Sequence, residues 1–330
     1  MKRLILFIVA MPIACFAGLW IAAGATGVGS VAAFARQMPP LSVVAVLAAS
    51  ITVASFVLGV VTGDYSWVDR SWSTVPPVFA WVYAVRSGFD PAVTVAALLI
   101  TAWGIRLTFN FARRGGYTSI EDYRWAILRD RIGSPALWHV FHLLFICAYQ
   151  VFLFVAFTLP VHALAASPTG GFTTPFVVFA TIFLLALVWE TIADEQQWRF
   201  QNAKNAARGK PAVSVPVDGI SREDITRGFR TTGLFRYSRH PNYFGELMVW
   251  WCVYFMAVGA LDTIMHPSGV GVVLLTLLFI GSTRFTESIT LSRYPEYRYY
   301  CVTTSAIIPW PPRAADRDPE MAGSGAAASG

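Results

Sequence analysis

The densest group of polar and titratable side chains lies just before an apolar run that begins near residue 244. Its members are Arg236, Arg239, His240, Asn242, Tyr243 and Glu246. Guanidinium groups hold phosphate in a bidentate manner, and a carboxamide both donates to and accepts from another carboxamide. Pro241 is typical of a first helical turn, so Asn242 and Glu246 are expected on one helix face. The group suits a nucleotide whose charged half lies in water and whose ring enters a bilayer; the alternative is a basic, aromatic membrane anchor.

Other polar positions are sparser. The segments Ala112–Ala136 and Asp194–Tyr243 carry charge, and Glu190 lies one turn before Asp194. An acid inside an apolar run usually faces a cavity or a partner, but this position also fits a membrane interface, and both interpretations stay open. The pair His139 and His142 has no nearby carboxylate or cysteine, so we expect hydrogen-bonded interfacial residues and no metal site.

The composition decides which elements position these residues. Of 330 residues, 55% are hydrophobic and 13% are charged, whereas soluble domains carry about 25% charged residues. This excludes an ordinary water-soluble globule and predicts an integral membrane protein. The net charge of +6 does not indicate nucleic acid, because the basic residues lie between apolar runs.

The predicted fold is an all-α bundle of about eight transmembrane helices. The expected spans are about residues 4–23, 41–61, 72–85, 91–111, 137–164, 175–193, 244–260 and 270–281, of which the third and eighth are short for the roughly 20 residues that cross a bilayer. Residues 1–40 would form an anchor helix and loop, residues 41–312 the transmembrane domain, and residues 313–330 a disordered tail rich in Ala, Gly and Ser.

The distribution of basic residues predicts the orientation. With eight spans and the N-terminus inside, Lys and Arg lie on or beside the cytoplasmic segments, apart from Arg36 and Arg86. Both termini are therefore expected in the cytoplasm. The first apolar run follows Lys2 and Arg3 and also resembles a signal peptide, but we expect an uncleaved anchor.

The stretch from Gly233 to Glu246 resembles the C-terminal signature of the membrane steroid 5-alpha-reductase superfamily, which also includes sterol C14 reductases and, more distantly, isoprenylcysteine carboxyl methyltransferases. The bacterial branch of DUF1295-type proteins is the most similar. Further stretches agree with that branch: Glu121–Trp125, Asp194–Phe200, and Tyr297–Tyr300 followed by Thr304–Trp310. The resemblance covers roughly residues 64–312 and implies a seven-helix core, with the first helix as an addition.

This resemblance implies the NADPH-dependent reduction of an activated carbon–carbon double bond in a lipid such as an enone. At matching positions, Asn242 and Glu246 would hold the nicotinamide end, with Tyr243 packed beside them and His240 in the same cofactor site. Asp194 would bind ribose or adenine groups. The phosphates would be held by Arg199, Arg236, Arg239, Tyr294 and Arg298.

The substrate end departs from the family pattern. Reduction of an enone needs a proton donor at the carbonyl oxygen, where charge develops. The family uses a tyrosine that precedes an arginine, but Trp103 occupies the matching site beside Arg106. We therefore expect Asp69 and Tyr123 as the catalytic candidates, and a structural role for each stays open.

Two alternatives remain at this stage. A methyltransferase that uses S-adenosylmethionine would share the stretch from Arg239 to Pro241 and Tyr243, whereas a non-catalytic lipid-binding protein would keep only the fold. The expected partners are a hydrophobic small molecule from the bilayer and membrane lipids, and no nucleic acid. The abundance of Arg and Ala suggests a bacterial cytoplasmic membrane.

Overall fold

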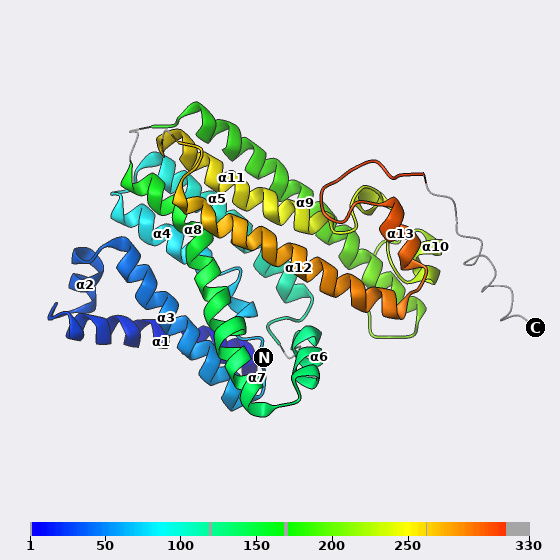
Figure 1. Cartoon of the computed structure of the whole chain (residues 1–330), viewed down its shortest axis with the longest axis horizontal. Helices are drawn as coiled ribbons and strands as arrows, with labels where there is room; N and C mark the ends of the chain where they lie inside the picture. The colour runs from blue at the N-terminus through cyan, green and yellow to red at the C-terminus, as the bar shows by residue number, and fades with distance from the viewer. Residues whose placement is uncertain (1, 119–120, 168–170, 262, 315–330) are drawn as a thin grey trace, which may run out of the picture. The chain divides into compact units, whose positions relative to one another are not determined.

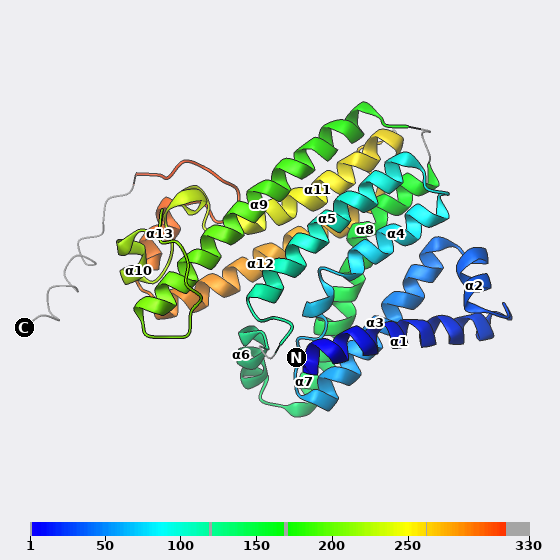
Figure 2. The ribbon, with the colours of Figure 1, turned by 180° about the vertical axis from the view of Figure 1, so that it is seen from behind.

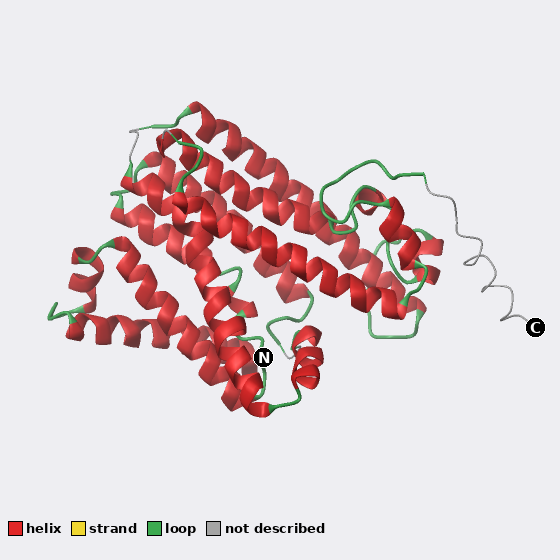
Figure 3. Cartoon of the chain, viewed as in Figure 1, coloured by secondary structure: helices red, strands yellow, loops and turns green. Residues whose placement is uncertain are grey.

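The structure is a computed structural model that describes residues 2–118, 121–167, 171–261 and 263–314. Within these ranges the chain forms helices joined by loops and contains no strand (Figure 3). The all-α prediction is therefore confirmed. The expected disordered tail lies, from residue 315 onward, outside the described residues.

The helices follow one another along the chain in the colour order of Figure 1. They are α1 (Lys2–Ala25), α2 (Val31–Gln37), α3 (Pro40–Thr62), α4 (Val75–Arg86), α5 (Pro91–Arg113), α6 (Tyr123–Ile132), α7 (Pro135–Phe141), α8 (Gln150–Ala166), α9 (Thr174–Ala207), α10 (Arg222–Arg227), α11 (Pro241–Leu261), α12 (Val270–Arg293) and α13 (Tyr297–Thr303). A π-helical segment, His142–Tyr149, joins α7 to α8.

Seven helical runs in the described ranges are long and apolar enough to cross a membrane, and they match every expected span except the third. The third span corresponds to α4, which has 12 residues. At about 1.5 Å per residue, this helix alone is shorter than a hydrocarbon core of roughly 30 Å. Two spans are longer than expected, because α9 continues to Ala207 and α12 continues to Arg293. Asp194 and Arg199 therefore lie on a helix and not in a loop.

The chain divides into two compact units. Unit 1 comprises residues 1–183 and 250–275, and unit 2 comprises residues 184–249 and 276–330. In unit 1, α1 packs along α3, and α4 packs against α5 and α8 (Figure 2). The apolar stretches form these helices because a bilayer offers no other partner for backbone N–H and C=O groups.

Arginine side chains of unit 1 make contacts at both of its ends. At one end, the Asp64 carboxylate accepts from Arg3 and from the fully buried Arg70, each at 2.7 Å. At the other end, Arg86 donates to the backbone oxygens of Arg36 and Met38. Arg36 and Arg86, the two exceptions in the count of cytoplasmic basic residues, therefore lie next to each other.

Unit 2 contains the C-terminal part of α9, the N-terminal turns of α11, the C-terminal part of α12, and α10 and α13. The helices α9 and α11 approach closely at Gly245, where an added Cβ would lie 2.6 Å from Glu190 Cβ. A second contact fixes the start of α11, because Trp189 Nε1 donates to the Pro241 oxygen at 2.9 Å. Glycine at position 245 therefore allows the polar faces of the two helices to meet.

Candidate functional site

Acidic and amide side chains from α9 and α11 meet inside unit 2. The Asn242 Nδ2 lies 3.5 Å from Asp194 Oδ1. Glu190, one turn before Asp194, and Glu246, one turn after Asn242, are both buried. The structure thus brings together three of the predicted cofactor residues, Asp194, Asn242 and Glu246. Carboxylate and carboxamide groups of this kind can also hydrogen-bond a carboxamide or hydroxyl ligand.

Arg239 and His240 share a carboxylate that the sequence analysis did not assign. The Glu287 carboxylate on α12 accepts from Arg239 Nε at 2.6 Å and from Arg239 Nη2 at 3.0 Å. The His240 Nε2 lies 3.0 Å from the same Oε1, and the His240 ring stacks on Tyr243 with centroids 5.0 Å apart. These side chains are 9 to 13% exposed, so solvent screens the cluster only weakly.

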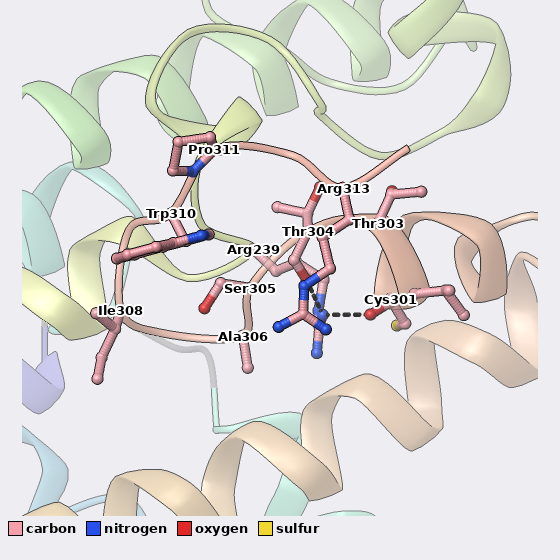
Figure 4. A pocket seen from close by; sticks show the side chains of 11 residues that line it. Arg239, Cys301, Thr303, Thr304, Ser305, Ala306, Ile308, Trp310, Pro311 and Arg313 are labelled. Carbon is pink, nitrogen blue, oxygen red and sulfur yellow. Dashed lines mark hydrogen bonds between the residues drawn. The ribbon is translucent and has the colours of Figure 1, made fainter. Parts of the chain in front are cut away.

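The remaining donors of Arg239 hold the end of the described chain, Tyr300–Arg313, which we call the C-terminal strap. Its Nη1 donates to the backbone oxygens of Cys301 and Thr304 (Figure 4). A guanidinium group has five N–H donors, and contacts within the chain use four of those of Arg239. Arg239 therefore has little capacity left for a phosphate.

Backbone hydrogen bonds also join the strap to the segment before α11. Arg239 N donates to Ser305 O at 2.9 Å, and His240 N donates to Ala306 O at 3.0 Å. Further along, Trp310 N donates to Tyr237 O at 2.9 Å. A hollow of about 410 Å³ lies against the strap. Figure 4 shows the strap side chains around Arg239 that line this hollow.

A larger pocket of about 710 Å³ opens between α10, α13 and the end of α12. Its lining includes two predicted phosphate ligands, Arg236 and Tyr294, together with Arg293, which the sequence analysis did not assign. Phe229, Tyr299 and Tyr300 provide aromatic surface. The volume lies within the range of small-molecule sites.

The field at this pocket is positive. A hydrogen bond from Arg208 Nη1 to the Tyr294 oxygen (3.2 Å), with Lys204 and Arg293 nearby, lowers the pKa of Tyr294 below its ordinary value. These cations come from the ends of α9 and α12. The environment therefore favours negative charge at and beside the phenol.

The loop between α10 and the pocket is fixed by a buried acid. The Asp224 carboxylate, 1% exposed, accepts from Thr231 N and Oγ1 at 3.1 and 2.7 Å and from Thr232 Oγ1 at 2.9 Å. Beside it, Arg230 Nη1 donates to the backbone oxygen of Gln196 at 2.8 Å. Aspartate 224 is therefore a structural residue that shapes one wall of the pocket.

The other predicted phosphate ligands lie apart from this pocket's lining. Arg199 pairs with Glu195 one turn earlier on α9 at 2.7 Å, with both side chains partly exposed. Arg298 is exposed on α13.

Tyr243, the residue expected beside the nicotinamide, packs edge to face on Phe279 with centroids 4.9 Å apart.

The two catalytic candidates belong to unit 1. Asp69 accepts a hydrogen bond from Trp125 Nε1 at 2.8 Å. Desolvation, assisted by the Asp122 carboxylate, raises the pKa of Asp69 to about 6. Tyr123 begins α6, two residues before Trp125, and its side chain is 49% exposed. The same helix turn thus contacts Asp69 and carries Tyr123.

Trp103, where the sequence analysis noted the absence of a tyrosine, is fully buried in unit 1. Its ring packs edge to face on Trp250 with centroids 4.8 Å apart. The Trp250 ring also contacts Phe157 at 4.1 Å. This position is occupied by aromatic packing and not by an acidic proton donor.

Two residues of unit 2 were missed because their partners are distant in sequence. Glu287 faces Arg239 across 48 residues, and Arg293 and Arg236 come from separate segments that line the same pocket. Glu287 lies on the polar C-terminal part of α12, one turn after Arg284, so its sequence neighbours gave no signal that it pairs with Arg239. The final helical turn of α12 gave no signal for Arg293 either.

Comparisons with known proteins identify the family that this chain matches. The family model described as a protein of unknown function (DUF1295) matches residues 55–304. An uncharacterized protein of Schizosaccharomyces pombe is 33% identical over 259 residues, which cover 74% of this chain and 75% of that protein. No solved structure matches the chain.

Proposed function

The chain belongs to the DUF1295 family, and on this premise we propose that it is a membrane-embedded reductase that uses NADPH to reduce an activated carbon–carbon double bond in a lipid enone. The contact between Asp194 and Asn242 is the observation that carries the proposal. It joins two helices whose facing side chains match the hydrogen-bonding needs of a carboxamide and of ribose hydroxyls.

The residues of unit 2 fit the two chemical ends of NADPH. Asn242 and the buried Glu246 supply a donor and acceptors for the nicotinamide carboxamide. Arg236 and Tyr294 line a pocket with surplus positive charge, which suits phosphate. When bound, NADPH would supply a hydride to the β carbon of the enone.

A donor must stabilise the enone oxygen as the hydride arrives. We assign this role to Asp69 or Tyr123. A carboxyl group whose pKa is about 6 keeps its proton in about a tenth of molecules at pH 7, far more often than one with the ordinary value, and this makes it a better general acid. Replacement of Asp69 by Asn would remove this proton while retaining the hydrogen bond from Trp125.

The competing cofactor is S-adenosylmethionine, which carries a sulfonium cation and no phosphate. The cations around Tyr294 favour an anionic cofactor. We also propose that the protein lies in a bacterial cytoplasmic membrane with both termini in the cytoplasm.

Thermal unfolding of the purified full-length protein tests the cofactor. A ligand at 100 times its dissociation constant stabilises the folded state by about 2.7 kcal/mol. We expect NADPH to raise the unfolding midpoint and S-adenosylmethionine to leave it unchanged. Stabilisation by the methyl donor alone would contradict the proposal, and a response to neither would favour a non-catalytic lipid-binding protein.

A matched pair of variants locates the effect. Asn242→Asp should abolish the NADPH response, because a second carboxylate beside Asp194 cannot donate to the carboxamide. Asn205→Asp makes the same chemical change on α9 and should respond like wild type. NADPH oxidation in the presence of lipid enones, followed by absorbance, then tests the reaction itself.

A further inference from the structure

The larger pocket of unit 2 contains cations without counterions. Arg236 and Arg293 both line it, and neither makes an ion pair or hydrogen bond with any residue that the structure describes. Both side chains are exposed. Two guanidinium groups that face one hollow, each with all its donors available, form a receptor for a doubly charged anion.

The acids of the same pocket do not neutralise this pair. Glu223 forms a short ion pair with Arg227, and Glu296 lies 4.0 Å from the same guanidinium. A third acid, Asp224, lies 3.7 Å from Arg227 behind the pocket wall, so all three acids lie on the Arg227 side and none pairs with Arg236 or Arg293. Lys204 and Arg208 add to the field next to Tyr294.

The walls of the pocket also carry aromatic side chains, which favour a ligand with a flat ring. Phe229, Tyr294, Tyr299 and Tyr300 give it flat aromatic surface, and the Arg208 guanidinium lies 5.9 Å from the Tyr294 ring centroid. A nucleobase can stack on such a surface, because every base has a flat aromatic face. The site therefore combines recognition of a ring with recognition of a phosphate.

We propose that this pocket binds a phosphorylated adenosine and that Arg236 and Arg293 together hold its 2′-phosphate. This inference rests on the proposed function and names the part of the protein that distinguishes NADPH from NADH. A phosphate monoester carries a charge of roughly −1.5 to −2 at neutral pH, which matches two guanidinium groups better than the single charge of a phosphodiester.

The proposal changes the role of Arg239. Because Glu287 and the strap oxygens occupy four of its donors, Arg239 fixes the strap and does not read the phosphate. Arg293, which the sequence analysis left unassigned, takes that role. The two arginines are separable by experiment, since Arg239 is tied to Glu287 and the strap whereas Arg293 is exposed in the pocket lining.

Binding to the full-length protein in detergent, measured by calorimetry, tests the pocket without any redox chemistry. The probes are adenosine 2′,5′-bisphosphate, 5′-AMP and inorganic phosphate. We expect the bisphosphate to bind at least 10-fold more tightly than 5′-AMP, with Arg236→Gln and Arg293→Gln each removing most of that preference. Arg222→Gln, an exposed residue of α10 outside the lining, is the matched control and should bind like wild type.

Three outcomes would overturn the inference. They are equal affinity for the bisphosphate and 5′-AMP, equal behaviour of Arg293→Gln and Arg222→Gln, and binding of inorganic phosphate as tight as that of the nucleotide. Unchanged thermal midpoints show that the variants fold.

The failure of the inference is distinguishable from the failure of the proposed function. Preference for the bisphosphate in a protein that does not oxidise NADPH would retain the pocket and reject the reductase. If Arg236→Gln and Arg293→Gln both bind NADPH as tightly as wild type, the pocket assignment is rejected and the reductase proposal is retained.

Discussion

The shared carboxylate of Glu287 leads to a quantitative prediction for Glu287→Gln. The variant keeps one acceptor oxygen but loses the charge and turns an NH₂ group toward Arg239. Removing one partner of a buried ion pair costs about 3–5 kcal/mol. Because the glutamine keeps one acceptor oxygen for Arg239, we expect a smaller cost of about 2 kcal/mol for releasing the strap.

Amide hydrogen exchange measures this release directly. The relevant amides are those of Arg239, His240 and Trp310, which join the strap to the segment before α11. A change of about 2 kcal/mol in opening free energy corresponds to roughly 30-fold faster exchange.

The control is Glu296→Gln, whose side chain is 74% exposed and 4.0 Å from its arginine. It should change exchange in the strap by less than about 2-fold, since exposed pairs contribute roughly 0–1 kcal/mol. Unchanged protection in Glu287→Gln, or the same acceleration in both variants, would refute the assignment of Glu287 as the residue that holds the strap.

Three further predictions concern helix contact, pH and topology. Gly245→Ala should lower the thermal stability by about 1–3 kcal/mol, as overpacking does, because its Cβ would lie 2.6 Å from Glu190 Cβ; unchanged unfolding would show that α9 and α11 can separate there. The pKa of Asp69 is raised from 3.8 to about 6, so the folded state binds the extra proton and stability should fall as pH rises from about 4 to 6; Asp69→Asn should lack this slope in thermal unfolding, and an identical slope would contradict the shift. A periplasmic reporter fused after Ala166 should be active and one after Lys210 silent, and the opposite pattern would reverse the orientation.

The predicted site residues were recovered unevenly. Asn242 and Glu246 were expected on one face because a helix brings residues four apart together. Arg236 and Tyr294 do line one pocket, and their phosphate role stays a prediction. Arg239, chosen for the same role by residue type, instead pairs with Glu287. Residue type indicates which ligand an arginine can hold, but its neighbours determine which of its donors are free.

The sequence by itself determined the class of fold and the position of seven spans. A bilayer leaves each apolar run only one way to satisfy its backbone hydrogen bonds, so hydropathy alone gives the helices. The start of α11 at Pro241 follows from local sequence in the same way, whereas the polar extension of α9 past Asp194 to Ala207 does not follow from hydropathy.

Only the tertiary structure decided which polar side chains meet. The contact between Asp194 and Asn242 depends on the close approach of α9 and α11 at Gly245. The pairing of Glu287 with Arg239 and His240 depends on α12 lying beside the start of α11. These partners are about 50 residues apart in the chain, and no periodicity of a helix extends across the intervening loops.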